Sequence, residues 1–170
     1  MKSLIFDSTP LIYLTRVGLV RLFELIPAQK FVARSVFREV VERGKVKGLA
    51  DALALEALFD AKTITIIEPS KKGVLRTFTS ISGLEEADAE TLAIAKEQGY
   101  RAVLDDLLAR KVARTYGIDF VGTPYLLMIA TNIRILTKKE ATKAVDEMIE
   151  AGWRCGPELY REILRLIEHS

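Results

Sequence analysis

Short apolar runs alternate with longer segments of helical spacing along most of this 170-residue chain. The runs lie at 3–6, 31–33, 63–67, 102–104 and 118–121, and each is too short to be a buried helix. Apolar residues recur every three or four positions in the segments between them. Strands that alternate with helices in this way pair in parallel. The pattern predicts an α/β fold in which helices cover both faces of a parallel sheet, as three α/β/α layers.

The end of the chain differs from this pattern. From Arg134 onward no strand pattern occurs, and helical segments are separated by a break near 152–157. We therefore expect an α/β domain over residues 1–133 and a helical C-terminal extension over 134–170, packed on the same domain. The polar, basic segment 69–83 lacks periodicity and is predicted to be mostly loop. Ser82 and Glu85 then match a capping box that would open the next helix.

The residue types exclude several kinds of chemistry. Cys155 is the single cysteine, which excludes a disulfide framework or a cysteine zinc site within one chain. His169 is the single histidine and the penultimate residue, so a Ser-His-Asp triad is not expected. Neither a transmembrane helix nor a signal peptide is indicated, and we expect a cytoplasmic protein without membrane contacts. Any catalysis must use carboxylates, hydroxyls and cations.

Acidic residues follow two of the predicted strands directly. Asp7 follows the first strand, and Asp105 and Asp106 follow a later one. Ligands of open α/β sheets bind outside the carboxyl ends of the strands, so these acids are placed to share one cleft. Each of them is equally suited to an ordinary turn or helix cap, which position alone does not exclude.

Two further acids lie on predicted helices. Asp88 shares a helical face with Leu84 and Leu92, so its carboxylate falls within an apolar stripe and needs a partner or a metal. A salt bridge to a nearby arginine is the alternative. Glu39 lies at the margin of the apolar face that contains Val40, where a surface glutamate is the simpler interpretation.

Carboxylates gathered in one cleft cannot all remain ionised without a cation. Ligands that are oxygen atoms only favour Mg²⁺ or Mn²⁺ over zinc. Such an ion can activate water and neutralise a phosphodiester, and this chemistry needs no histidine.

The order of these residues resembles the PIN-domain family of metal-dependent nucleases, over roughly residues 4–130. The opening LIFDSTPLIYL is similar to the first strand of the family with its Asp and Ser/Thr, and FVARSVFREVV to the second strand and helix with an acid. LEEADAETLAIAKEQG is similar to the helix of the third acid, and AVLDDLLARKVARTYGI to the strand and turn of the fourth.

The resemblance implies an endoribonuclease that uses Mg²⁺ or Mn²⁺, with residues 1–133 as the nuclease domain. The implied metal ligands and catalytic acids are Asp7, Glu39, Asp88 and Asp106. Thr9, with Ser8 beside it, would orient a carboxylate or water by hydrogen bonding.

Two of the implied ligands have neighbours that are alternatives. Asp105 is the alternative to Asp106, because Leu104 stands where the family often has Thr or Ser. The family spacing favours Asp106. Glu90 is the alternative to Asp88, and the position on the helical face favours Asp88.

Basic residues lie next to the proposed ligands and would guide a polyanion into an acidic cleft. The formal net charge is only +2, so local clusters matter more than the total. A solvated charged surface is the alternative for each cluster. The predicted nucleic-acid-binding residues are Lys71, Lys72 and Arg76, before the helix of Asp88, and Arg110 and Arg114, after Asp106.

The resemblance extends to a prokaryotic PIN subfamily related to VapC-like toxins, through DDLLARKVA and GWRCGPELYREIL. It implies an RNA substrate, the toxin role in a toxin–antitoxin pair and an antitoxin partner. Toxin-type relatives are commonly shorter, so the C-terminal extension would serve dimerisation or substitute for other contacts. A non-catalytic PIN module that binds RNA or protein is the alternative, against which the intact set of acids argues. A phosphatase of the haloacid dehalogenase type is disfavoured, because Thr9 stands where that chemistry needs a second acid.

Overall fold

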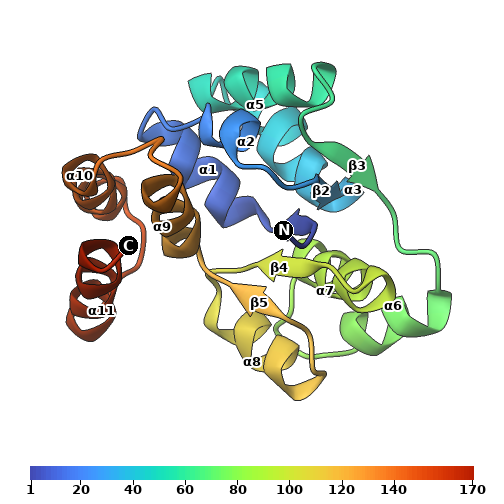
Figure 1. Cartoon of the computed structure of the whole chain (residues 1–170). Helices are drawn as coiled ribbons and strands as arrows, with labels where there is room; N and C mark the ends of the chain where they lie inside the picture. The colour runs from blue at the N-terminus through green and yellow to red at the C-terminus, as the bar shows by residue number, and fades with distance from the viewer.

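The computed structural model describes residues 1–170 and is built around a five-stranded sheet (Figure 1). The strand order is β3-β2-β1-β4-β5, and every neighbouring pair is parallel, as predicted. Ile5 in the central strand stands opposite Phe31 on one side and Ala102 on the other. The strands are β1 (Leu4–Phe6), β2 (Lys30–Ala33), β3 (Thr65–Ile67), β4 (Arg101–Val103) and β5 (Phe120–Val121).

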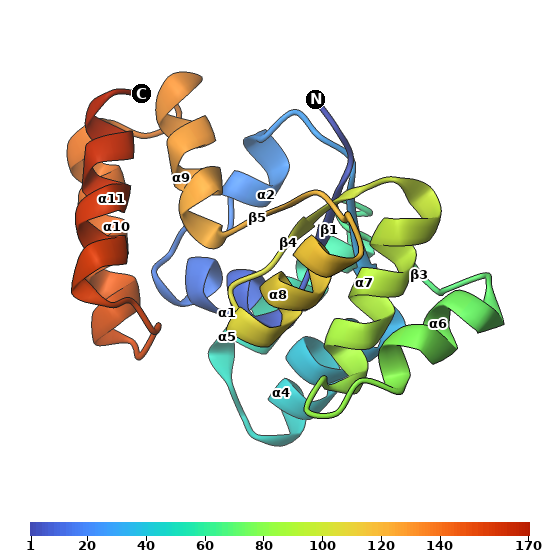
Figure 2. The same cartoon turned by 90° about the horizontal axis from the view of Figure 1, so that it is seen from below.

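Helices cover both faces of this sheet, which confirms the predicted three-layer α/β/α architecture (Figures 1 and 2). One face carries α6 (Lys72–Thr79), α7 (Glu86–Gln98) and α8 (Leu107–Thr115), and α7 packs directly against β1, β2 and β4. The other side carries α1 (Ser8–Arg16), α2 (Leu22–Leu25), α5 (Ala50–Asp60) and α9 (Thr123–Asn132). After β2 the chain forms α3 (Arg34–Phe37), the π-helix η1 (Arg38–Arg43) and α4 (Gly44–Val46). No helix combines the length and hydropathy that crossing a membrane would require.

The segment that precedes α7 is a helix, whereas the sequence predicted a loop. Val74, Leu75 and Phe78 of α6 turn toward the core, and the buried Phe78 ring meets the Tyr116 ring edge-on at 5.0 Å. Only these three apolar residues mark the inner face of α6. The helical pattern therefore extends over too few residues to be recognised in a basic segment.

The start of α7 also differs from its prediction. Glu85 occupies the N-cap position, and Ser82 lies three residues earlier in a turn, so the predicted capping box does not form. The end of α7 matches its prediction: Gly99 adopts a left-handed φ of 69°, which a glycine accepts without a steric penalty.

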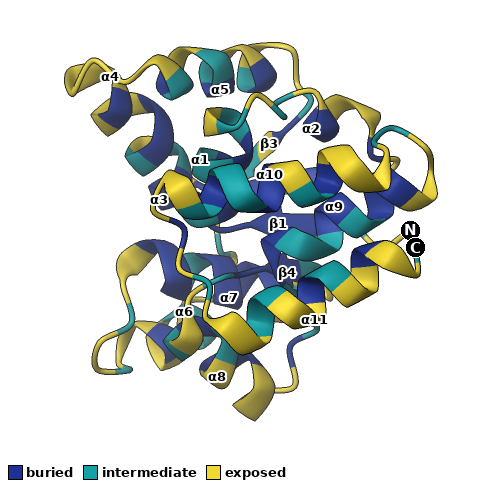
Figure 3. Cartoon of the chain, turned by 90° about the vertical axis from the view of Figure 1, so that its left-hand side faces the viewer, coloured by how far each residue is buried: buried dark blue, intermediate teal, exposed yellow.

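The C-terminal helices belong to the same core as the sheet (Figure 3). Val145 and Met148 of α10 (Lys138–Glu150) and Ile163 and Ile167 of α11 (Pro157–Glu168) are buried in one cluster with the strand residues. Both helices pack against α9, and α10 also reaches α1. Their polar sides face outward, as the exposed surfaces of α10 and α11 in Figure 3 show.

The strand order reverses between β1 and β4. The chain leaves β1 toward β2 and returns later to pair β4 on the opposite side of β1. Asp7 N donates to Val103 O across this junction at 3.2 Å, so the carboxyl ends of both strands lie side by side. In open α/β sheets such a switch point is where ligands bind.

Candidate active site

Asp7 is buried at the carboxyl end of β1, with 5 % of its surface exposed. It occupies the N-cap position of α1, yet its side chain makes no capping hydrogen bond. Burial raises the pKa of Asp7 well above its usual range, and the charges of Asp88, Glu39 and Asp105 raise it further. The Asp7 carboxylate therefore does not act as a helix cap, which was the alternative interpretation.

Asp88 lies in the first turn of α7 and is 9 % exposed, and its charge raises the pKa of Asp7. Burial raises the pKa of Asp88 to about 6, with a further contribution from the charge of Asp106 and smaller ones from Glu85 and Glu39. None of the ion pairs in the structure involves Asp88. The alternative of a salt bridge to arginine is therefore not realised.

Glu39 and Glu90 have different surroundings. Glu39 lies in the first turn of the π-helix η1 and accepts a 2.8 Å hydrogen bond from Ser8 Oγ, so Ser8 orients it. Single π-helical turns are frequent at functional sites, and this one breaks the regular helix that the sequence predicted. Glu90 accepts from the backbone N–H and the hydroxyl of Ser35, at 3.1 and 2.5 Å, at the start of α3. Glu90 thus ties α7 to α3, while the charge of Asp88 acts on Asp7.

Asp105 and Asp106 are held in different ways. Asp105 Oδ1 accepts from Thr123 N at 2.9 Å, and Oδ2 accepts from Thr123 Oγ1 at 2.6 Å and from Trp153 Nε1 at 3.0 Å. Asp106 is exposed and caps α8, where its Oδ1 accepts from Ala109 N at 2.8 Å. Asp105 raises the pKa of Asp7, and Asp106 raises that of Asp88, so both aspartates lie within electrostatic range of the buried acids.

A cavity of about 640 Å³ is lined by Asp105 and Asp106 but not by Asp7, Glu39 or Asp88, and we call it the cleft. Thr9, Asp105, Asp106 and Arg110 line it from the α/β domain, and 152–156, between α10 and α11, forms another wall. The sequence assigned no part of the site to this segment. The single tryptophan of the chain, in the short GWRCGP stretch, is the one signal that could have indicated it.

The chemistry of the donor set fits a hard divalent cation. Every candidate ligand is a carboxylate. Burial and acidic neighbours disfavour the ionised forms of Asp7 and Asp88, and neither side chain is paired with a cation. No three His, Cys, Asp or Glu side chains are gathered closely enough to hold one ion. Binding an ion would therefore require carboxylates to turn toward it.

The predicted basic residues fall in two separate places. Arg110 lines the cleft, and Arg114 lies one turn further along α8. Lys71 N donates to Glu97 at 3.0 Å, at the opposite end of α7 from Asp88. The structure thus brings the α8 arginines close to the acids and leaves Lys71 away from them. Lys72 is next to Lys71 in the chain, and Arg76 is exposed on α6.

Comparison with known proteins connects this arrangement to a family. The family described as PIN domain matches residues 3–169. An 83-residue stretch is 34 % identical to Endoribonuclease Nob1 of Pyrococcus abyssi, covering 45 % of this chain and 51 % of that protein, so the chain spans about half the length of this curated relative. A solved domain of a functionally unknown protein from Methanocaldococcus jannaschii has a TM-score of 0.49 and 20 % identity, covering 72 % of this chain and 91 % of that one.

Proposed function

The chain belongs to the PIN-domain family, and on that premise we propose that it is a Mg²⁺- or Mn²⁺-dependent endoribonuclease. The observation that carries the proposal is the buried pair Asp7 and Asp88 at the switch point, each with its pKa raised by burial and by neighbouring acids. Similarity to an endoribonuclease over half its length supports a nuclease function.

The acids and hydroxyl residues in and beside the cleft each have a proposed role. Asp7, Glu39, Asp88 and Asp106 would hold the ion, which when bound supplies an activated water and neutralises phosphodiester charge. Ser8 keeps Glu39 oriented through its hydrogen bond, and Thr9 would hold water in the cleft.

Asp105 and the basic residues remain outside this ligand set. Asp105, fixed by Thr123 and Trp153, would add negative charge beside Asp7 and is the alternative ligand to Asp106. Arg110 and Arg114 would bind substrate phosphates, and Lys71, Lys72 and Arg76 would contact only more distant parts of a long RNA.

A toxin role with an antitoxin partner, and dimerisation through α10 and α11, are further proposals that rest on the resemblance of the sequence. If the role is correct, expression in a bacterial host arrests growth and the Asp7→Asn variant does not. The competing function is a PIN module that binds RNA or protein in the same cleft without cleaving.

The decisive experiment is cleavage of a mixed, structured RNA pool by the purified chain with Mg²⁺, with Mn²⁺ and with EDTA. Asp7→Asn tests the site, and Asp60→Asn, an exposed aspartate at the end of α5, is the matched control. We expect cleavage that needs the metal and Asp7 and is unaffected in the control. No cleavage by folded protein that binds Mn²⁺ would favour the binding module.

A further inference from the structure

A second cavity, of about 430 Å³, adjoins the cleft between α8, β5, α9 and α11, and we call it the groove. Leu107, Arg110, Pro124 and Leu159 line both cavities, so the groove continues directly from the cleft. Its volume lies at the low end of the range of about 300–1,000 Å³ that small ligands occupy. A single nucleotide is of this class of size, whereas a folded partner would cover a far larger surface.

Cations of α8 dominate the charge along the groove. Arg110, Lys111 and Arg114 line it, and none of them is part of an ion pair in the structure. Glu162 of α11 is the single acidic lining residue. The net positive charge of this lining complements a phosphodiester.

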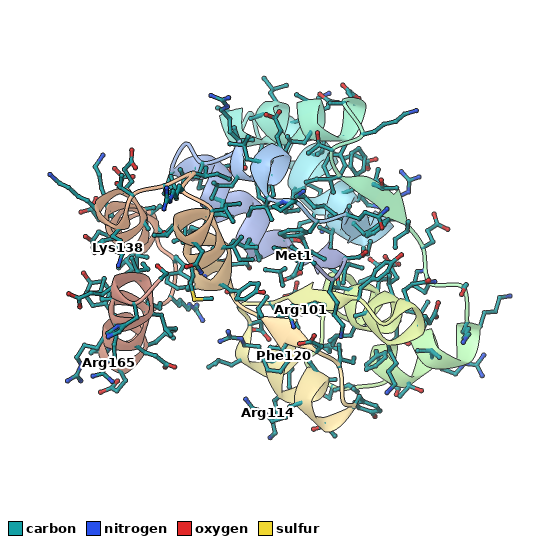
Figure 4. All side chains as sticks on the ribbon, in the orientation of Figure 1. Met1, Arg101, Arg114, Phe120, Lys138 and Arg165 are labelled. Atoms are coloured by element: carbon teal, nitrogen blue, oxygen red, sulfur yellow. The ribbon has the colours of Figure 1, made fainter.

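Arg110 is held where the cleft and the groove meet. Its guanidinium lies over the Phe120 ring at 5.7 Å from the centroid, and the Arg114 guanidinium shares that ring at 5.9 Å. Figure 4 shows Arg114 and Phe120 together on α8 and β5. A Cβ at position 122 would lie 2.6 Å from Arg110 Nη2 and 3.1 Å from Asp105 Oδ1, so Gly122 permits this close approach.

The hydrogen bonding of Arg110 is incomplete. Its Nε is buried and has no hydrogen-bond partner in the protein. The guanidinium is positioned by an aromatic ring, has no ion pair and lines two cavities. It is suited to bind a phosphate oxygen through its terminal nitrogens, because the Nε atom has no accessible surface.

The remainder of the groove is mainly apolar. Leu159, Ile163 and Leu166 of α11 face Phe120 and Tyr125 across it. Apolar and aromatic surfaces accept the flat face of a nucleobase without selecting its sequence.

We propose that the groove binds the nucleotide next to the one whose phosphodiester is hydrolysed, with its phosphate on Arg110 and Arg114 and its base against α11. The inference rests on the proposed nuclease function, because it takes the cleft as the place of cleavage. It assigns α11 a part in holding the substrate.

The test is binding of a fluorescein-labelled, ten-nucleotide single-stranded RNA in EDTA, followed by fluorescence anisotropy across a salt series. Arg114→Ala removes one exposed cation of the groove. Its control is Arg21→Ala, at the exposed N-cap of α2, a helix that Figure 1 shows on the opposite side of the sheet from α8. Leu166→Glu places a negative charge on a groove residue that is 49 % exposed, and Leu53→Glu, 61 % exposed on α5, is its control. All four positions are on the surface, so folding is retained.

We expect Arg114→Ala to weaken binding about tenfold and to lower the slope of log Kd against log salt by about 0.7. Leu166→Glu should weaken binding by at least as much, and both controls should bind as the natural chain does. Mn²⁺ affinity should not change in either groove variant, because neither touches the acids.

Unchanged RNA affinity in both groove variants, or no RNA binding by the natural chain, would overturn the proposal and leave the groove to a different class of partner. If cleavage still required metal and Asp7, the nuclease function would stand without the groove. RNA binding through the groove without any metal-dependent cleavage would show that the groove binds RNA and that the proposed nuclease function is wrong.

Discussion

Among the acids of the candidate site, Asp7 and Asp88 are the two whose pKa values are raised. Both are buried, both have raised pKa values, and neither is paired with a cation. In a stable protein such groups are retained where they serve function, because an apolar or amide side chain would be less costly. Stability and activity should therefore respond in opposite directions when these acids are replaced.

The pKa of Asp88 sets a pH dependence of stability in metal-free buffer. The carboxyl titrates near 3.8 when unfolded and at about 6 when folded, so the folded state binds more protons between these values. The contribution of Asp88 to the free energy of unfolding should fall as pH rises through this window, by at most about 3 kcal/mol, and should stay constant above it. Thermal melts in EDTA from pH 4 to pH 7 measure this, and Asp88→Asn should reduce the slope. An equal slope in Asp88→Asn would contradict the assignment.

Asp7→Asn should separate chemistry from folding. Loss of a group that supports a metal ligand costs about 10–100-fold. If Asp7 holds the ion as proposed, its loss costs more, so we expect cleavage to fall at least about a hundredfold. In EDTA at pH 7 the variant should melt at the same temperature or higher, because a neutral amide replaces a buried carboxyl group whose ionised form is disfavoured. Adding Mg²⁺ should raise the melting temperature of the natural chain and not that of the variant. A variant that is folded and fully active would remove Asp7 from the site.

At the level of elements, the connection between α10 and α11 joins the C-terminal helices to the cleft. Residues 152–156 form one wall of it, and the Trp153 indole N–H donates to the same Asp105 oxygen that accepts from Thr123 Oγ1. Trp153 is 5 % exposed, so this hydrogen bond is shielded from water. The connection thus positions an acid of the site as well as packing on the core.

Trp153→Phe should keep the ring and remove the hydrogen bond to Asp105. We expect a loss of about 1–2 kcal/mol in the free energy of unfolding and about tenfold weaker Mn²⁺ binding. If Trp153 acts through Asp105, the loss in Mn²⁺ affinity should largely disappear when both Trp153→Phe and Asp105→Asn are present. Strictly additive effects in this double-mutant cycle would show that Trp153 has only a packing role.

At the scale of the whole molecule, one hydrophobic core joins the sheet, its helical layers and the C-terminal extension. Ile163 and Ile167 of α11 and Val145 and Met148 of α10 are buried in the same cluster as β1 and β4. Together their burial contributes on the order of 8 kcal/mol, at about 2 kcal/mol each, which is comparable with the whole stability of a typical domain.

Deletion of residues 134–170 should therefore prevent cooperative folding of the remainder. The truncated chain would expose the inner side of α9 and lose the contacts of α10 with α1. We expect it to aggregate or to lose a sharp thermal transition, measured by circular dichroism and limited proteolysis. A fragment 1–133 that melts cooperatively near the temperature of the full chain would show that the extension is an independent addition.

The local pattern of apolar residues was sufficient to predict the strands, the parallel sheet and its helical layers, because each depends on periodicity over a few residues. It also placed Asp7 and Asp105 at strand ends and Asp88 on an inner helical face. The eight-residue helix α6 was not predicted, because three apolar residues in a basic segment give too weak a helical pattern. The π-helical turn at Glu39 has no sequence signal of comparable strength.

The arrangement of the acids and of the cleft depends on contacts between residues that are far apart in the chain. Ser8 reaches Glu39 across 31 residues, Thr123 reaches Asp105 across 18, and Trp153 reaches Asp105 across 48. No local pattern contains such pairings, because they arise only when the parallel strands bring their carboxyl ends together and α10 closes on α1 and α9. Which residues are acidic and which elements they follow is a property of the sequence. Which of them are buried, and which hydrogen bonds hold them, follows from the packing of distant elements.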